Sequence, residues 1–210
     1  PPPEGWIEVV SQTLAACGLS RDVIAHTPQE WAAPNGGDEL ALTVLIERRP
    51  LWGTPREPLP APDGLARDRV LAALADRALA YSPPTGFDAD RVLELDGTRS
   101  DRLDIRSAAV VPIVELGRWA GAVAGLVEGS TPERLQAGAD AGALDAGDAA
   151  SLTEAFELAL ELRIAHHVQQ LAKGATPDDR IETASISPLS RDYLRDVFRA
   201  VTAAQRRLRG

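Results

Sequence analysis

The sequence predicts a mainly α-helical protein with an antiparallel helical bundle in its C-terminal half. Apolar residues recur every three or four positions in several long stretches, which is the spacing that places them on one face of a helix. Short polar segments join these stretches from about residue 107 onward, and short connections favour antiparallel neighbours. The 210 residues are 44% hydrophobic and 25% charged, as in ordinary globular proteins, and are enough to enclose a core.

The N-terminal part of the chain is predicted to contain helices over residues 6–17, 39–49 and 66–81. Residues 42–46 (Leu-Thr-Val-Leu-Ile) are rich in strand-forming types, so a strand is the alternative to the second helix. Residues 82–87 (Ser-Pro-Pro-Thr-Gly-Phe) predict a rigid turn with Phe87 as its apolar anchor. Residues 90–95 form a short element whose type the sequence leaves open.

A helix over residues 112–127 is predicted to carry an unusual stripe of glycines. Gly117, Gly121 and Gly125 are four residues apart and therefore share a face. Each glycine in a helix interior costs roughly 1 kcal/mol relative to alanine, so three on one face need a reason. Close packing of a neighbouring helix is one reason. The other is a ligand or loop that lies against bare backbone beside Arg118.

Three further helices are predicted after this one. Thr131 is expected to cap the first, and the proline that follows it suits the first turn of a helix. Either Asp145 or Asp148 begins the second, a long helix that runs to Lys173. Ser187, again followed by a proline, opens the last helix, which reaches the C-terminal arginines.

Charge and cysteine content restrict the compartment and the partners. The net charge is −9 and the pI is about 4.9, whereas general nucleic-acid binders present a basic surface, so no nucleic-acid partner is expected. No segment approaches the roughly 18 apolar residues of a membrane span and no signal sequence opens the chain, so no membrane partner is expected. One cysteine, Cys17, fits a reducing compartment, and we expect a cytoplasmic protein. Because the chain starts with Pro1 and contains no methionine, we also expect it to be part of a longer polypeptide.

Candidate binding residues gather around two of the predicted helices. Arg163, His167 and Gln170 fall on one line of the long helix and offer cationic and amide donors that suit a phosphate or nucleotide. The alternative is that they hydrogen-bond loops or acids within the bundle. Asp104 and Arg106 precede the glycine-striped helix, where they form either a cap and a surface pair or part of a site. One cysteine and three histidines do not make a typical zinc site, and neither a phosphate-binding loop nor a nucleophile elbow is present.

Many short motifs in the C-terminal half resemble those of a known family. The motifs are Asp104-Ile105-Arg106, Pro112-Ile113-Val114, Gly117-Arg118, Thr131-x-Glu133-Arg134-Leu135, Ala155-Phe156, Leu162-Arg163, Gln170, Gly174, Pro177-Asp178, Leu189-Ser190 and Gln205. They look like the substrate-binding domain at the C-terminus of bacterial DUF294-type nucleotidyltransferases, which resemble the uridylyltransferase of the PII nitrogen-signalling protein.

The first half resembles the end of the catalytic domain in the same family. The similar segments are Cys17-Gly18-Leu19 with Trp31, residues 45–53, and the Pro-Pro-Thr-Gly-Phe turn that ends at Phe87. The resemblance implies three regions. Residues 1–60 would be the tail of an α/β nucleotidyltransferase-like domain, 61–106 a connecting helix and turn, and 107–210 the helical substrate-binding domain.

The resemblance also implies a metal-dependent transfer reaction. Enzymes of this superfamily hold nucleotide phosphate with a Gly-Ser motif and Mg²⁺ with three acids, two of them in an Asp-x-Asp pair. Neither motif occurs before Cys17. Only the third acid has a candidate here, Asp22 in Arg21-Asp22-Val23, which would be both catalytic and a metal ligand. The alternative is that Asp22 is an ordinary turn residue.

Two functions therefore remain open. In the first, the chain belongs to a signal-transduction nucleotidyltransferase that moves a nucleotidyl group from a nucleoside triphosphate to an acceptor, such as a protein. Arg118, Arg163, His167, Gln170, Asp104 and Arg106 would then contact nucleotide or acceptor. In the second, the chain is a non-catalytic regulatory module that binds a nucleotide or a partner protein. By resemblance, the parent protein carries CBS or cyclic-nucleotide-binding domains.

Overall fold

The computed structural model describes residues 5–16, 67–88, 90–126 and 129–209. Helix α1 (Trp6–Ala16) confirms the first predicted helix; it belongs to a different compact unit from the C-terminal elements and is described by itself. None of its residues is buried. The predicted helix over residues 39–49 and the candidate Asp22 lie outside the described residues.

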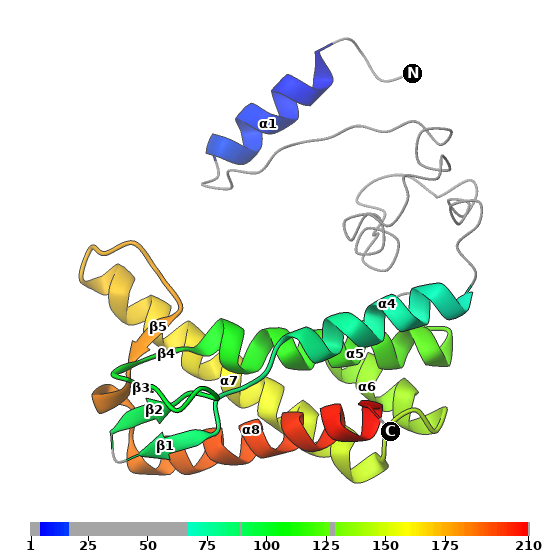
Figure 1. Cartoon of the computed structure of the whole chain (residues 1–210). Coiled ribbons are helices and arrows are strands. Elements are labelled where there is room, and N and C mark those ends of the chain that lie inside the picture. The colour runs from blue at the N-terminus through cyan, green and yellow to red at the C-terminus, as the bar shows by residue number, and fades with distance from the viewer. Residues whose placement is uncertain (1–4, 17–66, 89, 127–128, 210) are drawn as a thin grey trace. The chain divides into compact units, whose positions relative to one another are not determined.

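The C-terminal unit is a bundle of helices, as predicted. In Figure 1, α4 and α7 run in one direction and α5 and α8 in the other. The helices are α4 (Arg67–Ala80), α5 (Val111–Ala124), α6 (Thr131–Asp140), α7 (Ala146–Ala172) and α8 (Pro188–Arg209). The mainly α-helical fold class is therefore confirmed. The division at residues 60 and 106 stays a prediction.

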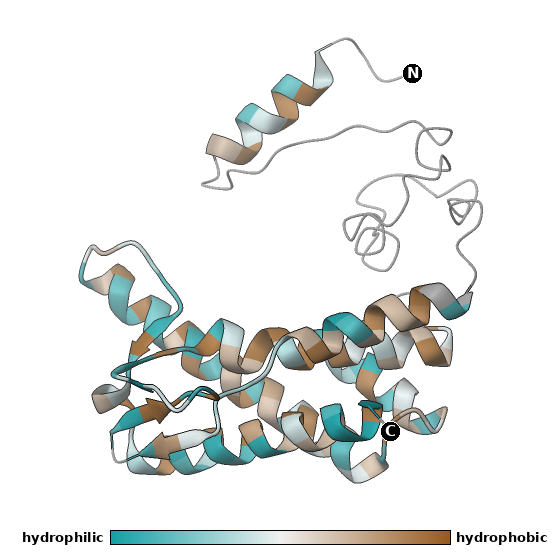
Figure 2. Cartoon of the chain, viewed as in Figure 1, coloured by the Kyte–Doolittle hydropathy of each residue, from teal (hydrophilic) through white to brown (hydrophobic). Residues whose placement is uncertain are grey.

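Apolar residues on the inner faces of these helices form one core. Figure 2 shows apolar and hydrophilic residues alternating along the helices, as expected for amphipathic elements. On α8, for example, Leu194, Val197, Phe198 and Val201 are buried, as the sequence predicts. Burying each such side chain contributes roughly 1.5–3 kcal/mol.

Short strands cover one end of the bundle. The antiparallel strands β1 (Gly86–Asp88), β2 (Arg91–Leu93) and β3 (Arg99–Ser100) form one small sheet, so the undefined element at residues 90–95 is a strand. Phe87 on β1 stacks on Phe198 of α8, with ring centroids 6.0 Å apart, and is the anchor that the sequence predicts. A second antiparallel pair joins β4 (Arg102–Asp104) to β5 (Arg180–Glu182), so the region after residue 112 is not wholly helical.

Two of the three glycines in the predicted stripe allow α5 and α6 to pack closely. A Cβ added at Gly117 would lie 3.1 Å from Thr131 Cγ2, and one at Gly121 would lie 2.9 Å from Arg134 Cγ. The packing interpretation is therefore confirmed at these two positions. The third position is a correction, because α5 ends at Ala124 and Gly125 has a left-handed φ of 77° that stops the helix.

Several predicted helix ends shift by one residue. Ser130, rather than Thr131, is the N-cap of α6, because its hydroxyl accepts from Glu133 N while the Glu133 carboxylate accepts from Ser130 N. Asp145, the first of the two alternatives, caps α7. A π-helical turn, η1 (Arg106–Val110), leads directly into α5.

The continuous helical segment Arg106–Ala124 is long and apolar enough, by length and composition alone, to cross a membrane. This corrects the expectation that no segment approaches that length. Inside the fold, 56% of its most apolar window is buried. Its apolar character is that of a central core helix, because it packs against α4, α6 and α8.

Candidate functional site

The C-terminal half of α7 extends beyond the core and is held by polar contacts. The last buried residue of α7 is Ala159, although the helix continues to Ala172. Beyond Ala159, four polar side chains face the segment that returns to β5, and with its two aspartates they form what we call the α7–β5 cluster. Its members are Arg163, His166, His167, Gln170, Asp178 and Asp179.

Asp179 is the centre of this cluster. Arg163 donates from Nε to Asp179 Oδ1 at 2.6 Å and from Nη2 to Oδ2 at 3.2 Å, which is the two-pronged geometry of a strong guanidinium–carboxylate pair. His167 Nε2 lies 2.9 Å from the same Oδ1. Because a carboxylate only accepts, the proton of this bond belongs to the histidine.

The electrostatics of the pair keep Asp179 ionised. Burial would raise the pKa of Asp179, but the hydrogen bond and charge of Arg163, and then those of His167, outweigh burial and lower the pKa. The carboxylate therefore carries a full negative charge at neutral pH, and it offsets the positive charge of Arg163.

A second set of contacts holds Asp178. Gln170 uses both ends of its amide: Nε2 donates to Asp178 Oδ1 at 3.1 Å, and Oε1 accepts from Asp178 N at 2.9 Å. Arg180 N also donates to Asp178 Oδ1 and, with Gln170, lowers the pKa of Asp178. His166 differs from these residues. Its Nε2 is buried, lies 3.5 Å from Asp178 Oδ1 and has no hydrogen-bond partner.

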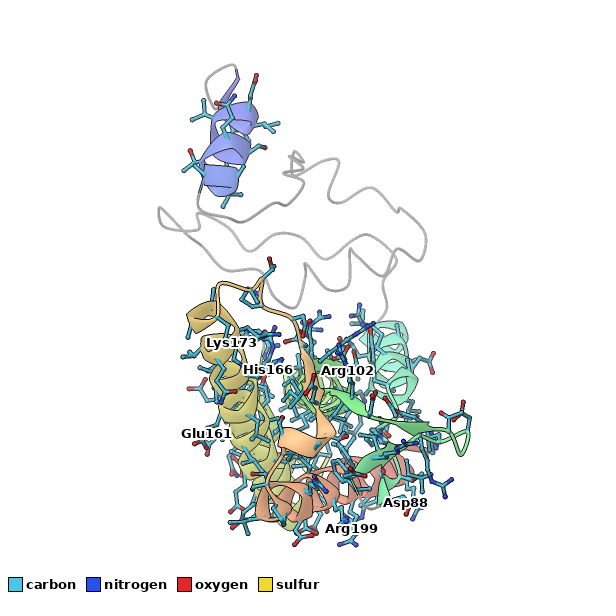
Figure 3. All side chains as sticks on the ribbon, turned by 90° about the vertical axis from the view of Figure 1, so that its left-hand side faces the viewer. Asp88, Arg102, Glu161, His166, Lys173 and Arg199 are labelled. Atoms are coloured by element: carbon cyan, nitrogen blue, oxygen red, sulfur yellow. The ribbon has the colours of Figure 1, made fainter. Side chains whose placement is uncertain are left out.

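Strands β4 and β5 place the cluster beside two further cations. Ile105 N donates to Asp179 O at 3.0 Å, and Asp104 stands opposite Arg180 in the strand register. Within the described part of the chain, the exposed side chains of Arg106 and Arg180 form no ion pair. Figure 3 labels three basic residues of this region: His166 on α7, Lys173 directly after the end of α7, and Arg102 on β4.

Five of the six predicted substrate-binding residues thus lie in one region. Arg163, His167 and Gln170 belong to the α7–β5 cluster, and Asp104 and Arg106 flank it on the β4 side. In this structure Arg163, His167 and Gln170 bond acids of the same domain, which is the alternative to ligand binding that the sequence left open. Asp104 also behaves as a cap, since its Oδ1 accepts from Ser107 N at 2.9 Å.

Arg118 belongs to a separate cluster between α4 and α5. Its guanidinium donates to Glu115 Oε1, which also accepts from Arg77 Nη2 at 2.9 Å. The Glu115 side chain is only 3% exposed, and its second oxygen, Oε2, is buried without a hydrogen-bond partner. Arg118 is therefore bound to a core acid, while Asp22 lies outside the described residues.

Sequence reasoning did not identify the acids that complete these clusters. Asp178 is part of a family motif, but the sequence pattern singles out neither of the acids Asp179 and Glu115, nor the neighbouring cation Arg180. The short connection after α7 was the available signal, because Gly174 must turn the chain back along the helix with a φ of 71°. A loop that returns along a helix brings its own side chains to that helix.

Metal binding has no candidate among residues 5–16, 67–88, 90–126 and 129–209. No group of three or more histidine, cysteine, aspartate or glutamate side chains there is arranged to hold an ion. The adjacent Asp178 and Asp179 are already bonded to cationic and amide groups. The described residues therefore contain no preformed cluster of three such side chains for a metal ion.

Comparison with known proteins identifies the domain. No curated protein and no solved structure matches the chain. The family model described as "Putative nucleotidyltransferase substrate binding domain" matches residues 68–210, which cover α4 to the end of α8 and therefore most of the chain. The chain belongs to this DUF294-type family, and its bundle is the family's substrate-binding domain.

Proposed function

We propose that this chain supplies the acceptor-binding part of a signal-transduction nucleotidyltransferase. The enzyme would move a nucleotidyl group from a nucleoside triphosphate to an acceptor, and a protein acceptor fits the resemblance to the PII-modifying uridylyltransferase. The helical bundle would orient the acceptor, because bringing two reactants into the correct geometry lowers the barrier of a transfer reaction. The family match supports the binding role of the domain.

One observation carries the location of the binding surface. Arg106 and Arg180 are exposed, form no ion pair among the described residues, and lie next to the ordered contacts of the α7–β5 cluster. In a chain with a net charge of −9, these guanidinium groups are well placed to attract an anionic ligand. The planar guanidinium group suits both phosphate and carboxylate. The surface therefore suits an acidic acceptor or a nucleotide phosphate.

The metal chemistry would take place outside the described residues. Mg²⁺ would neutralise the triphosphate, with Asp22 as one ligand and the remaining acids elsewhere in the parent protein. By the same resemblance, the parent would be a cytoplasmic protein of bacteria with CBS or cyclic-nucleotide-binding domains. The residues of this domain would bind and orient the acceptor only.

The experiment uses the full parent protein, Mg²⁺ and each of the four nucleoside triphosphates labelled at the α-phosphate. Transfer of label to an acceptor from the same cell identifies both substrates. The double change Arg106→Gln/Arg180→Gln should then raise KM for the acceptor at least tenfold and leave kcat nearly unchanged. Each charge-assisted hydrogen bond contributes about 1.5–3 kcal/mol, so losing two readily accounts for such a change.

A matched control removes two arginines from a different surface. Arg195 and Arg199 on α8 each pair with an aspartate three residues earlier. The change Arg195→Gln/Arg199→Gln should leave KM within about twofold of the wild-type value, because surface ion pairs contribute at most about 1 kcal/mol. Equal KM values for the two double variants would refute the proposed surface. An Asp22→Asn protein with unchanged transfer would remove the metal role of that residue.

The regulatory module remains the second candidate. It is favoured by the contacts of Arg163, His167 and Gln170, which bind the domain's own acids in this structure. Nucleotide or protein binding by the complete parent, without any label transfer, would establish this function instead.

A further inference from the structure

The α7–β5 cluster contains an internal anion. The Asp179 carboxylate accepts three hydrogen bonds from Arg163 and His167, and two of them come from one guanidinium. A phosphate or a ligand carboxylate presents the same oxygens to the same donors. The donors are therefore already arranged for an anion of this shape, and a side chain of the chain itself is bound there.

The segment that carries this anion is held mainly by polar contacts. The last two residues of α7 and the connection that follows them, together residues 171–178, are all exposed. Asp179 itself is anchored through its backbone, because its carbonyl accepts from Ile105 N. A change of its side-chain rotamer would release Arg163 and His167 while the β4–β5 pairing stays in place.

A second observation in the cluster points to an unfilled bonding requirement. His166 Nε2 is buried and lacks a hydrogen-bond partner, and the nearest acid oxygen is 3.5 Å away. Buried polar atoms are nearly always bonded in native proteins, so an orphan atom at a candidate site indicates a missing partner or another arrangement. Exposed Arg106 and Arg180, on the strand side, add positive charge to the same region.

We infer that Arg163 and His167 form a binding site for a phosphate or carboxylate group of the acceptor or nucleotide, and that Asp179 occupies this site until the ligand displaces it. The inference rests on the proposed function, since it specifies how the substrate-binding domain takes an anionic ligand. It also explains how the contacts seen here and a binding role for the same residues can both hold. Binding exchanges one anion for another at the same donors.

The test measures the binding of inorganic phosphate to the 210-residue chain by NMR titration of the Arg163 Nε–H and His167 ring signals. Asp179→Asn keeps the size of the side chain and removes its charge, so phosphate should bind at least tenfold more tightly than to the wild type. Asp196→Asn is the matched control, because it removes one carboxylate from an arginine pair on α8. Its affinity for phosphate should stay within about twofold of the wild-type value.

The double variant Arg163→Gln/Asp179→Asn should lose the gain in phosphate affinity that Asp179→Asn alone shows. Equal affinities for Asp179→Asn and Asp196→Asn would overturn the inference, as would a gain that persists without Arg163. A measurement on the unmodified chain avoids dependence on variants that fail to fold. Saturating phosphate should return the pKa of Asp179 toward its ordinary value, as followed by carbon NMR of the carboxylate. A pKa that does not respond to phosphate would overturn the inference.

The outcomes separate this inference from the proposed function. If Asp179→Asn shows no gain while the parent still transfers label to its acceptor, only the inference fails. If the gain appears but the parent neither binds a nucleotide nor transfers label, the anion site stands and the transferase proposal fails.

Discussion

Replacing Gly138 with alanine tests whether close packing of α5 and α6 determines the arrangement of the bundle. A Cβ built on Gly138 would overlap the Ala120 side chain and lie 3.1 Å from Ala120 Cα and 3.2 Å from its carbonyl carbon. Carbon atoms normally meet at about 3.5–4.0 Å, and here part of the obstacle is backbone. The helices must therefore move apart to admit one methyl group.

The expected loss of stability follows from two opposing effects. Overpacking a buried site costs about 1–3 kcal/mol, whereas alanine in place of glycine in a helix returns up to about 1 kcal/mol. We expect a net loss of about 2 kcal/mol in the free energy of unfolding of Gly138→Ala. For a chain of this size, that loss lowers Tm by about 4–8 °C. Thermal and urea denaturation followed by circular dichroism measure both quantities.

Two comparisons make the result decisive. Gly147→Ala makes the same substitution in the first turn of α7, where the new Cβ would lie 3.1 Å from one Asp145 side-chain oxygen. That oxygen accepts from Gly147 N, and a shift of a few tenths of an ångström keeps this cap in place, so the Tm should change by less than about 2 °C. Ala120→Gly combined with Gly138→Ala should recover part of the loss, with a coupling energy of about 1 kcal/mol or more. A Gly138→Ala protein as stable as the wild type, or a double variant without coupling, would refute the reasoning.

Four further substitutions, of which Glu133→Gln serves as a comparison, test other contacts, each by urea denaturation. Ser130→Ala should cost about 1 kcal/mol because it breaks the capping box of α6, whereas Glu133→Gln preserves the box and should cost less; equal losses would contradict the assignment of the cap. Glu115→Gln should lower the free energy of unfolding by about 3 kcal/mol, because Arg77 and Arg118 then face a neutral group in a buried position. A loss below about 1 kcal/mol would show that the ion pairs of Glu115 are solvated. Asp179→Asn should cost about 1–3 kcal/mol at pH 7. The folded-state pKa of Asp179 is lowered, so its contribution is present above the unfolded pKa near 4 and disappears as pH falls through the folded value. The wild-type and variant stabilities should therefore converge in acid, and a constant difference down to pH 2 would contradict this sign.

The bundle could be predicted from sequence because its signals are local. A stripe such as Leu194, Val197 and Val201 depends only on the helical repeat, and all three residues are buried as expected. The end of α5 was harder to predict from sequence, because Gly125 fits equally well as a third glycine of the stripe and as a left-handed residue that ends the helix. Only the packing of α6 shows which glycines face a helix.

The candidate site was predictable only in part, for a related reason. The line of Arg163, His167 and Gln170 follows from helix geometry, but their partners come from a segment that returns to the helix after a turn at Gly174. Nothing in local periodicity specifies which side chain of that segment meets the line. The pairing with Asp179 depends on the β4–β5 register, which is a contact between distant parts of the chain.

The contacts of the α7–β5 cluster hold the end of α7, and the same donors form the proposed ligand site. The last turns of α7 bury no apolar residue, so the polar contacts of Asp178 and Asp179 are what join them to β5. If the ligand displaces the Asp179 carboxylate from Arg163 and His167, binding breaks the contact between these side chains and Asp179 that helps to hold the end of α7. The Asp179→Asn protein should then be less stable and bind phosphate more tightly, whereas a purely structural contact predicts only the loss of stability. A loss of stability together with a gain in phosphate affinity in the same variant therefore distinguishes a ligand site from a contact that only stabilises the fold.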